Sequence, residues 1–258
     1  MAETSASDPE SLAPRTLAID IGGTGLKASV VGESGEMLEK RVRVATPYPC
    51  TPDVLVEALT GLTAPLEAYD RISIGFPGVV RDGRIITAPH FQGKAWVDYP
   101  LAETLARRFG KPARLLNDAE VQGLGIVKGR GLEVVLTLGT GLGSAVFSNG
   151  ALTPHLELAH HPIRKGETYN DYVGNAARRA VGSKRWNKRV RKTIEIVYAL
   201  LHYDILHLGG GNAANVTVDL PDTVHIASND AGITGGIRLW DEVVWNGVLG
   251  SHAVSPAR

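Results

Sequence analysis

Cysteine is almost absent from this sequence of 258 residues, which contains a single thiol, Cys50. One cysteine excludes an internal disulfide bond and a zinc site built from several cysteines. This usage is typical of a reducing compartment, and we expect a cytoplasmic protein, although a cysteine-poor periplasmic protein would have the same composition.

A charge excess and long hydrophobic runs are lacking as well. Lys plus Arg equals Asp plus Glu at 27 each, so no overall field attracts nucleic acid or an anionic membrane. No apolar stretch reaches the roughly 18 residues that a membrane-spanning helix needs. Residues 1–14 carry acids and no hydrophobic run, so we expect a disordered segment there rather than a secretory signal. The hydrophobic content of 43% nevertheless supports a sizeable core and excludes disorder of the whole chain.

Glycine is abundant, with 30 residues, and the patterns around it indicate an α/β protein. Strands and helices alternate along the chain, and three of four glycine clusters directly follow a predicted strand. The predicted strands cover 16–21, 26–31, 37–44, 71–75, 113–116, 133–138, 144–147 and 205–208, with a hairpin over 79–86. The predicted helices cover about 53–62, 101–109, 119–128, 169–203 with a break near Gly182, and 234–245 before a polar tail. Direct matching shows no internal repeat.

The chain has no long linker, so a boundary between domains would be a hinge. We place it near Asp118, which gives a small N-terminal α/β domain over residues 15–118 and a larger C-terminal one over 119–258.

Two glycine hairpins are candidates for binding phosphate. The first follows a strand and reads Asp20-Ile21-Gly22-Gly23-Thr24-Gly25-Leu26-Lys27, and the second reads Gly139-Thr140-Gly141-Leu142-Gly143. Neither is a Walker A loop or a dinucleotide-binding fingerprint, and a single glycine hairpin is more often structural. Two of them in one chain, each offering backbone amides and a threonine hydroxyl at a strand end, favour a polyanion site.

The order of motifs resembles that of the ROK sugar kinases, within the actin-like ATPase superfamily, and the first loop is closest to that of the polyphosphate glucokinases. Further matching segments are Gly75-Phe76-Pro77-Gly78, Asn117-Asp118-Ala119, Glu157-Leu158-Ala159-His160 and Gly209-Gly210-Gly211-Asn212. The resemblance implies a ribonuclease-H-like fold of two domains around a cleft, with the last helix packing back across the hinge. It also implies a homodimer.

The resemblance assigns the candidate site residues. Asp118 would be the general base for the sugar 6-hydroxyl, because a hydroxyl that attacks a phosphoryl group needs a carboxylate to accept its proton. Without that context, Asn117-Asp118 is more often a helix N-cap. The implied sugar ligands are Asn117, Asp118, Glu157, His160 and Gly78. The implied phosphate ligands are Gly22, Gly23, Thr24, Lys27, Gly139, Thr140 and Gly141. Asp20 would orient Mg²⁺ through water, and Gly210, Gly211 and Asn212 would meet a nucleotide.

Some features depart from the family or fall outside its motifs. Ala159 stands where the family has glycine, and the cysteine-rich zinc loop of many ROK proteins is missing, so we expect no zinc. Polyphosphate glucokinases lack that loop too. His155 and His161 are expected to be bystanders.

The most basic segment is 178–192, with eight Lys and Arg in fifteen residues and no acid. Such a run is usually a solvated helix face. Its helical spacing could also form a ridge that tracks polyphosphate, made by Lys184, Arg185, Lys188, Arg189 and Lys192, with Arg191 on the same face. RNA or an acidic partner is an alternative ligand.

These observations predict an enzyme that phosphorylates glucose at O6, with inorganic polyphosphate as the favoured donor and Mg²⁺ as cofactor. The alternatives are an ATP-dependent ROK hexokinase and a non-catalytic sugar-binding ROK protein. ROK repressors carry an N-terminal helix-turn-helix, which fourteen polar residues cannot supply. Acceptance of mannose or glucosamine is left open.

Overall fold

The computed structural model describes residues 13–66, 68–91, 93–228 and 230–247. Most of the N-terminal segment expected to be disordered, and the polar tail from residue 248, lie outside the described residues. No helix within the described residues has the length and apolar character needed to cross a membrane.

The first of two five-stranded sheets is mixed and has the order β3-β2-β1-β4-β7. β1 and β2 form an antiparallel hairpin to which β3 adds, while β4 and β7 run parallel to β1. The strands are β1 (Thr16–Ile21), β2 (Gly25–Val31), β3 (Val42–Ala45), β4 (Arg71–Phe76) and β7 (Ala113–Asn117).

The second sheet repeats this topology in the order β10-β9-β8-β13-β14. Again a three-stranded antiparallel meander is followed by two parallel strands. The strands are β8 (Leu132–Leu138), β9 (Leu142–Ser148), β10 (Ala151–Leu152), β13 (Ile205–Gly209) and β14 (Val224–Ile226). The structure therefore contains a duplication that direct sequence matching did not detect, and each half begins with one of the two glycine hairpins.

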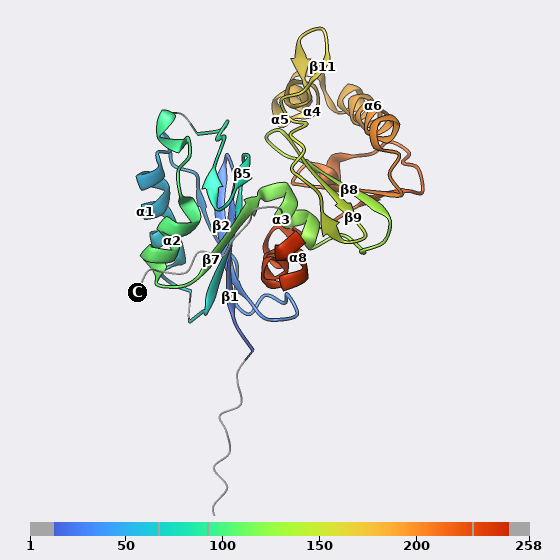
Figure 1. Ribbon diagram of the computed structural model, residues 1–258. Helices are drawn as coiled ribbons and strands as arrows, with labels where there is room; N and C mark the ends of the chain where they lie inside the picture. Colours follow the sequence, from blue (N-terminus) through green and yellow to red (C-terminus); the bar gives the residue numbers. More distant parts are fainter. Residues whose placement is uncertain (1–12, 67, 92, 229, 248–258) are drawn as a thin grey trace, which may run out of the picture.

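Helices cover both sheets and also lie between them (Figure 1). α1 (Pro52–Thr63) and α2 (Leu101–Phe109) cover the outer face of the first sheet around a core that includes Trp96. α4 (Tyr169–Val173), α5 (Asn175–Val181) and α6 (Ser183–Leu201) pack on the second sheet around Trp186. Between the sheets lie α3 (Asp118–Leu124), α7 (Ala231–Thr234), the 3-10 helix η3 (Gly235–Trp240) and α8 (Glu242–Gly247).

The short remaining elements complete the connections. They are the hairpins β5 (Val80–Arg81) with β6 (Arg84–Ile85) and β11 (Pro162–Arg164) with β12 (Glu167–Thr168), and the 3-10 helices η1 (Lys94–Trp96) and η2 (Ala213–Asn215). The hairpin predicted around Asp82-Gly83 is confirmed, with both residues at positive φ.

The C-terminal helical segments pack against the first sheet. The Ser73 hydroxyl of β4 donates to the Gly236 carbonyl at 2.6 Å, and the buried Arg114 guanidinium of β7 donates to the Leu239 carbonyl at 2.6 Å. Gly235 has no room for a side chain, because an added Cβ would lie 2.1 Å from the Val121 carbonyl of α3. Residues 235–239 are therefore held against the first sheet and α3.

Three predicted elements have wrong boundaries. The third strand begins at Val42 rather than residue 37, because Met37 makes only an isolated bridge with Val31 and the chain then leaves the ladder. The helix predicted over 119–128 ends at Leu124. The last predicted helix is three pieces, α7, η3 and α8, with extended backbone at Asp241. The break near Gly182 is confirmed, and Gly174 adds a second one.

Candidate active site

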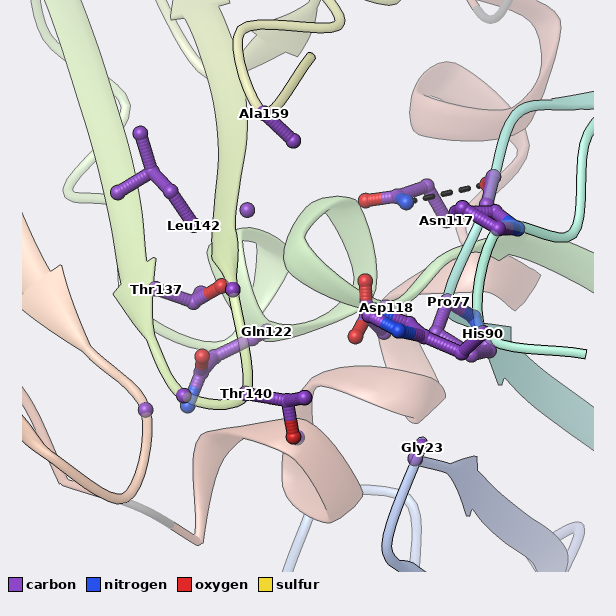
Figure 2. A pocket seen from close by; sticks show the side chains of 18 of the residues that line it. Gly23, Pro77, His90, Asn117, Asp118, Gln122, Thr137, Thr140, Leu142 and Ala159 are labelled. Carbon is purple, nitrogen blue, oxygen red and sulfur yellow. Dashed lines mark hydrogen bonds between the residues drawn. The ribbon is translucent and has the colours of Figure 1, made fainter. Parts of the chain in front are cut away.

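A cavity of about 390 Å³ lies between the two sheets and is bordered by both glycine hairpins. Figure 2 shows Gly23 of the first hairpin, Thr140 of the second and Asp118 of α3 around the same space. The predicted site residues that line the cavity are Asp20, Gly22, Gly23, Thr24, Lys27, Gly78, Asn117, Asp118, Gly139, Thr140, Gly141, Glu157, His160, Gly210 and Gly211. Segments far apart in sequence thus meet at one site.

The first hairpin is braced by the segment that follows β3. The Thr46 hydroxyl donates to the Gly22 carbonyl at 2.6 Å, and the Tyr48 hydroxyl donates to the Gly23 carbonyl at 2.5 Å. Beside the turn, the Lys27 ammonium donates to Asp20 Oδ2 at 2.6 Å. This wall of the cavity therefore carries the ion pair of Asp20 and Lys27 next to a glycine turn whose backbone carbonyls are fixed by hydrogen bonds.

The second hairpin is held by two asparagines. Asn212 Nδ2 donates to the Gly139 carbonyl at 3.2 Å, and Asn170 Oδ1 accepts from the Leu142 amide at 2.8 Å. An added Cβ at Gly141 would lie 2.2 Å from Asn170 Oδ1, so glycine is required for this close packing. Asn212 does not line the cavity. It supports the hairpin, whereas Gly210 and Gly211, which were also predicted to contact a nucleotide, line the cavity.

Asn117 and Asp118 stand where β7 ends and α3 begins. Asn117 is the N-cap, because its Oδ1 accepts from the Ala119 amide at 2.9 Å. In turn, the Asn117 backbone amide donates to Glu120 Oε2 at 3.2 Å. Asn117 Nδ2 also donates to the Gly78 carbonyl at 3.1 Å. The cap predicted from the sequence is therefore present, and both amide atoms of the Asn117 side chain bond to the protein backbone.

Asp118 is partly buried, and its environment disfavours the charged form. Burial raises the pKa of its carboxyl to about 7, with contributions from the negative charges of Asp20, Glu120 and Glu157. The Ala119 amide, which donates to Asp118 Oδ1 at 2.9 Å, opposes this rise only in part. A carboxyl with a pKa near neutral is suited to accept and release a proton under physiological conditions.

The opposite wall carries Glu157 and His160, in the segment between β10 and β11. The Ala159 amide donates to Glu157 Oε1 at 3.2 Å. Ala159 is not at positive φ, so alanine is accommodated where the family has glycine. Burial would raise the pKa of Glu157, but the neighbouring His155, His160 and the Ala159 amide lower it below its ordinary value. Glu157 is therefore a charged acceptor facing Asp118 across the cavity.

Sequence reasoning missed several residues of this cavity, among them His90, His155 and Arg43. His155, which was expected to be a bystander, lies beside Glu157. His90 reaches the first hairpin, with its ring 3.2 Å from the position of a Cβ on Gly23, and burial lowers its pKa. No local pattern marks these side chains, because they come from loops that only the fold brings together.

The basic residues of α6 do not line the cavity, and one of them is not on the surface. Arg189 is buried, donates to the Tyr172 carbonyl at 3.1 Å and stacks over the Tyr172 ring at 4.7 Å. Its place in an exposed ridge is therefore a wrong prediction. Lys192 and Arg191 pair with Glu195, while Lys184, Arg185 and Lys188 are exposed.

Comparison with known proteins agrees with the motifs. The model of the ROK family matches residues 16–156, which is more than half of the chain. The chain belongs to the ROK family.

Two relatives of this ROK protein are similar over most of its length. It is 28% identical over 233 residues to the polyphosphate glucokinase of Mycobacterium tuberculosis, covering 84% of this chain and 88% of that one. The crystal structure of the inorganic polyphosphate/ATP-glucomannokinase from Arthrobacter sp. strain KM matches with a TM-score of 0.80 and 29% identity, covering 87% and 97%. The resemblance to polyphosphate glucokinases is confirmed.

The fold class is confirmed as well. The ROK family glucokinase from Streptomyces griseus, solved with glucose and AMPPNP, matches with a TM-score of 0.72 over 87% of this chain and 98% of that one. At 21% identity this likeness shows the fold alone. The protein has the actin-like ATPase fold of the ROK sugar kinases, with a cleft between its two halves.

The raised pKa of Asp118 predicts how the stability of the substrate-free protein depends on pH. A carboxyl whose pKa is near 7 in the folded state and near 3.8 when unfolded holds its proton more tightly in the folded state. It therefore destabilises the fold as pH rises from about 4 to about 7. Asp118→Asn should raise the unfolding midpoint at pH 8 by about 2–4 °C or more, since about 1 kcal/mol corresponds to that change in a chain of this size.

The measurement is thermal unfolding of both proteins at pH 4.5 and pH 8. The gain should be about a quarter as large at pH 4.5, where Asp118 is protonated in the folded protein but largely ionised in the unfolded chain. An equal difference at both values would show that the pKa of Asp118 is not raised.

Proposed function

We propose that this protein phosphorylates glucose at O6, with inorganic polyphosphate as the favoured donor and ATP as the alternative. The observation that carries the proposal is Asp118, with its pKa near 7, in a cavity bordered by both glycine hairpins. The similarity to a polyphosphate glucokinase and to a polyphosphate/ATP-glucomannokinase supports the choice of substrates. A cytoplasmic location and a homodimer belong to the same proposal, by analogy with relatives.

The acceptor would lie between Asp118 and the opposite wall. Glu157, as a charged acceptor, and His160, as a ring that can donate, would bind neighbouring hydroxyls of the pyranose. Asn117 would contribute a further bond, after its amide atoms exchange part of their contact with the Gly78 carbonyl. O6 would then point at Asp118.

The reaction transfers one phosphoryl group in line. The glucose 6-hydroxyl loses its proton to Asp118 while O6 forms a bond to the terminal phosphorus, and the bond to the bridging oxygen of the donor breaks. The shortened polyphosphate, or ADP, leaves with that oxygen. Backbone amides of the two hairpins, around Gly22–Thr24 and Gly139–Gly141, would stabilise the charge on the transferred group.

Magnesium would be held through water by Asp20. Mg²⁺ commonly uses one or two protein carboxylates, completed by water and substrate phosphates, and the single Asp20 carboxylate at the strand end fits that requirement. When bound, Mg²⁺ would neutralise phosphate charge. Within the described residues, no cluster of three or more acidic, histidine or cysteine side chains forms a ready-made metal cage.

We further propose that the junction near Asp118 is the hinge between a small and a larger domain. Closure about it would bring the hairpins together on the donor and exclude water, which limits wasteful hydrolysis.

The donor would meet a row of charges on the first sheet. Asp20 is paired with Lys27 in the register of β1 and β2, and Lys27 is paired with Arg43 in the register of β2 and β3. Two cations directly opposite each other repel unless an anion lies between them. Within the described part of the chain, the Arg43 side chain has no ion pair or hydrogen bond, yet it lines the cavity beside Gly25. It is therefore available for phosphate.

The exposed basic residues of α6 would have a different role. Because Lys184, Arg185 and Lys188 do not border the cavity, they would contact only polyphosphate chains long enough to extend beyond the cleft.

Formation of glucose 6-phosphate tests the proposed function. Purified protein with glucose and Mg²⁺ should form it with long-chain polyphosphate at a higher kcat/KM than with ATP. Asp118→Asn should lower kcat by at least 100-fold, because general-base catalysis contributes about 10²–10⁴-fold, while glucose still binds in calorimetry. If neither donor gives product, the proposed function is rejected. Near-normal turnover of the Asp118→Asn variant would reject Asp118 as the base.

Arg43→Gln tests the proposed path of the donor. Removing one charge-assisted phosphate contact should raise KM for polyphosphate about 5- to 20-fold, while KM for glucose changes less than twofold. The matched control is Arg107→Gln, on the exposed face of α2 and outside the cavity, which should leave both constants unchanged. An unchanged KM for polyphosphate in the Arg43 variant would remove Arg43 from the donor path.

A further inference from the structure

His155 lies between two carboxylates that belong to different parts of the site. Its Nδ1 is 2.7 Å from Glu120 Oε1, and its Nε2 is 3.6 Å from Glu157 Oε2. Glu120 is in the first turn of α3, whereas Glu157 is in the segment between β10 and β11. The ring thus bridges the helix that begins at Asp118 and the loop on the opposite wall.

The chemistry of the ring decides its charge in this position. A neutral imidazole has one N–H donor, so its second nitrogen would present a lone pair to a carboxylate oxygen. Only the imidazolium offers a donor to both Glu120 and Glu157. Its Nε2 is buried and has no hydrogen bond within the described residues, and Glu157 is the carboxylate within ion-pair distance of it.

Both carboxylates also contact the backbone close to site residues. Glu120 Oε2 accepts from the amide of Asn117 at 3.2 Å, which fixes the start of α3. Glu157 Oε1 accepts from the Ala159 amide at 3.2 Å, which leaves Oε2 facing His155. A charged ring between them therefore links the position of the helix N-terminus to the orientation of Glu157.

We propose that His155, as an imidazolium, is a positioning residue that holds the sugar-facing carboxylate of Glu157 in place against the helix that carries Asp118. This inference rests on the proposed function, because it takes Glu157 as a ligand of the sugar. It concerns binding of the acceptor rather than proton transfer, so its loss should act on KM for glucose more than on kcat.

The electrostatics of the surroundings agree with this role. Burial by itself would lower the pKa of His155, but the hydrogen bond with Glu120 and the negative charges of Glu120 and Glu157 raise it to about 9. The other titratable groups that line the same cavity are Asp20, Lys27, Arg43, His90, Asp118 and His160. The ring is therefore charged throughout the neutral range, and it loses its proton only as pH rises through about 9.

His155→Gln tests the proposal, because glutamine keeps a polar side chain and removes the charge. We expect KM for glucose to rise about tenfold with kcat changed less than threefold, because Glu157 loses its charged partner while the reacting atoms are untouched. The matched control is His161→Gln, an exposed histidine of the same segment, which should leave both constants unchanged. Equal effects of the two variants would overturn the proposal.

The pH profile separates positioning from a merely structural role. In the wild type, KM for glucose should rise as pH increases through about 9, and in His155→Gln this rise should be absent. Glu120→Gln retains an acceptor for the Asn117 amide but lowers the pKa of His155, so the rise should begin at lower pH. A rise that persists unchanged in His155→Gln would contradict the inference.

A measurement that needs no turnover distinguishes failure of this inference from failure of the proposed function. In the ¹⁵N-histidine-labelled full chain, the His155 signals are identified by their loss in His155→Gln. They should show a ring protonated at both nitrogens at pH 7.5, with a midpoint near 9. A midpoint near the ordinary 6.5 would overturn the positioning role of His155, even if the protein is an active kinase. A midpoint near 9 in a protein that does not phosphorylate glucose would reject only the proposed function.

Discussion

The site depends on one electrostatic constraint, which is that three carboxylates line one cavity and a fourth, that of Glu120, is buried close to them. Asp20, Asp118, Glu120 and Glu157 come from the end of β1, the start of α3 and the opposite loop. Cations offset the cost of this grouping at three of them, because Lys27 pairs with Asp20 and His155 lies between Glu120 and Glu157. Within the described residues, Asp118 has no such partner, and burial together with the neighbouring carboxylates raises its pKa to about 7. The carboxylate left without a cation is the one that the proposed function takes as the base.

The duplicated topology explains how these groups meet. Each sheet begins with a glycine hairpin and continues into parallel strands, so the two halves bring equivalent strand ends toward each other. α3 and η3 lie between the sheets, and glycine at position 235 allows their backbones to approach. The same packing that joins the halves therefore fixes Asp118 between the two hairpins.

Much of this arrangement could be predicted from the sequence, because it depends on local patterns. A strand followed by glycines and a hydroxyl predicts a turn at an identifiable place, and the order of such turns indicated the family. Long-range contacts could not be predicted in the same way. His155 pairs with Glu120, 35 residues earlier in the chain, and no periodicity marks such a pair. The repeat of the two halves likewise lies in strand order rather than in matching residues.

Errors in the sequence-based prediction have physical causes as well. Helical spacing placed Arg189 near an exposed ridge, but spacing does not tell which side of a helix packs, and the Tyr172 ring and carbonyl bury this guanidinium. The last helix was predicted as one continuous element over about 234–245. The backbone at Asp241 is extended, which separates η3 from α8.

The most direct test of this account is the titration of Asp118 itself. The side-chain carboxyl can be followed by ¹³C NMR in the full chain labelled at aspartate, with the signal identified by its loss in Asp118→Asn. The account predicts a midpoint near 7 in the protein without substrate or metal, because burial and three neighbouring carboxylates oppose the charge. A midpoint near 4 would contradict it, because Asp118 would then be an ordinary ionised N-terminal helix residue with no special affinity for a proton.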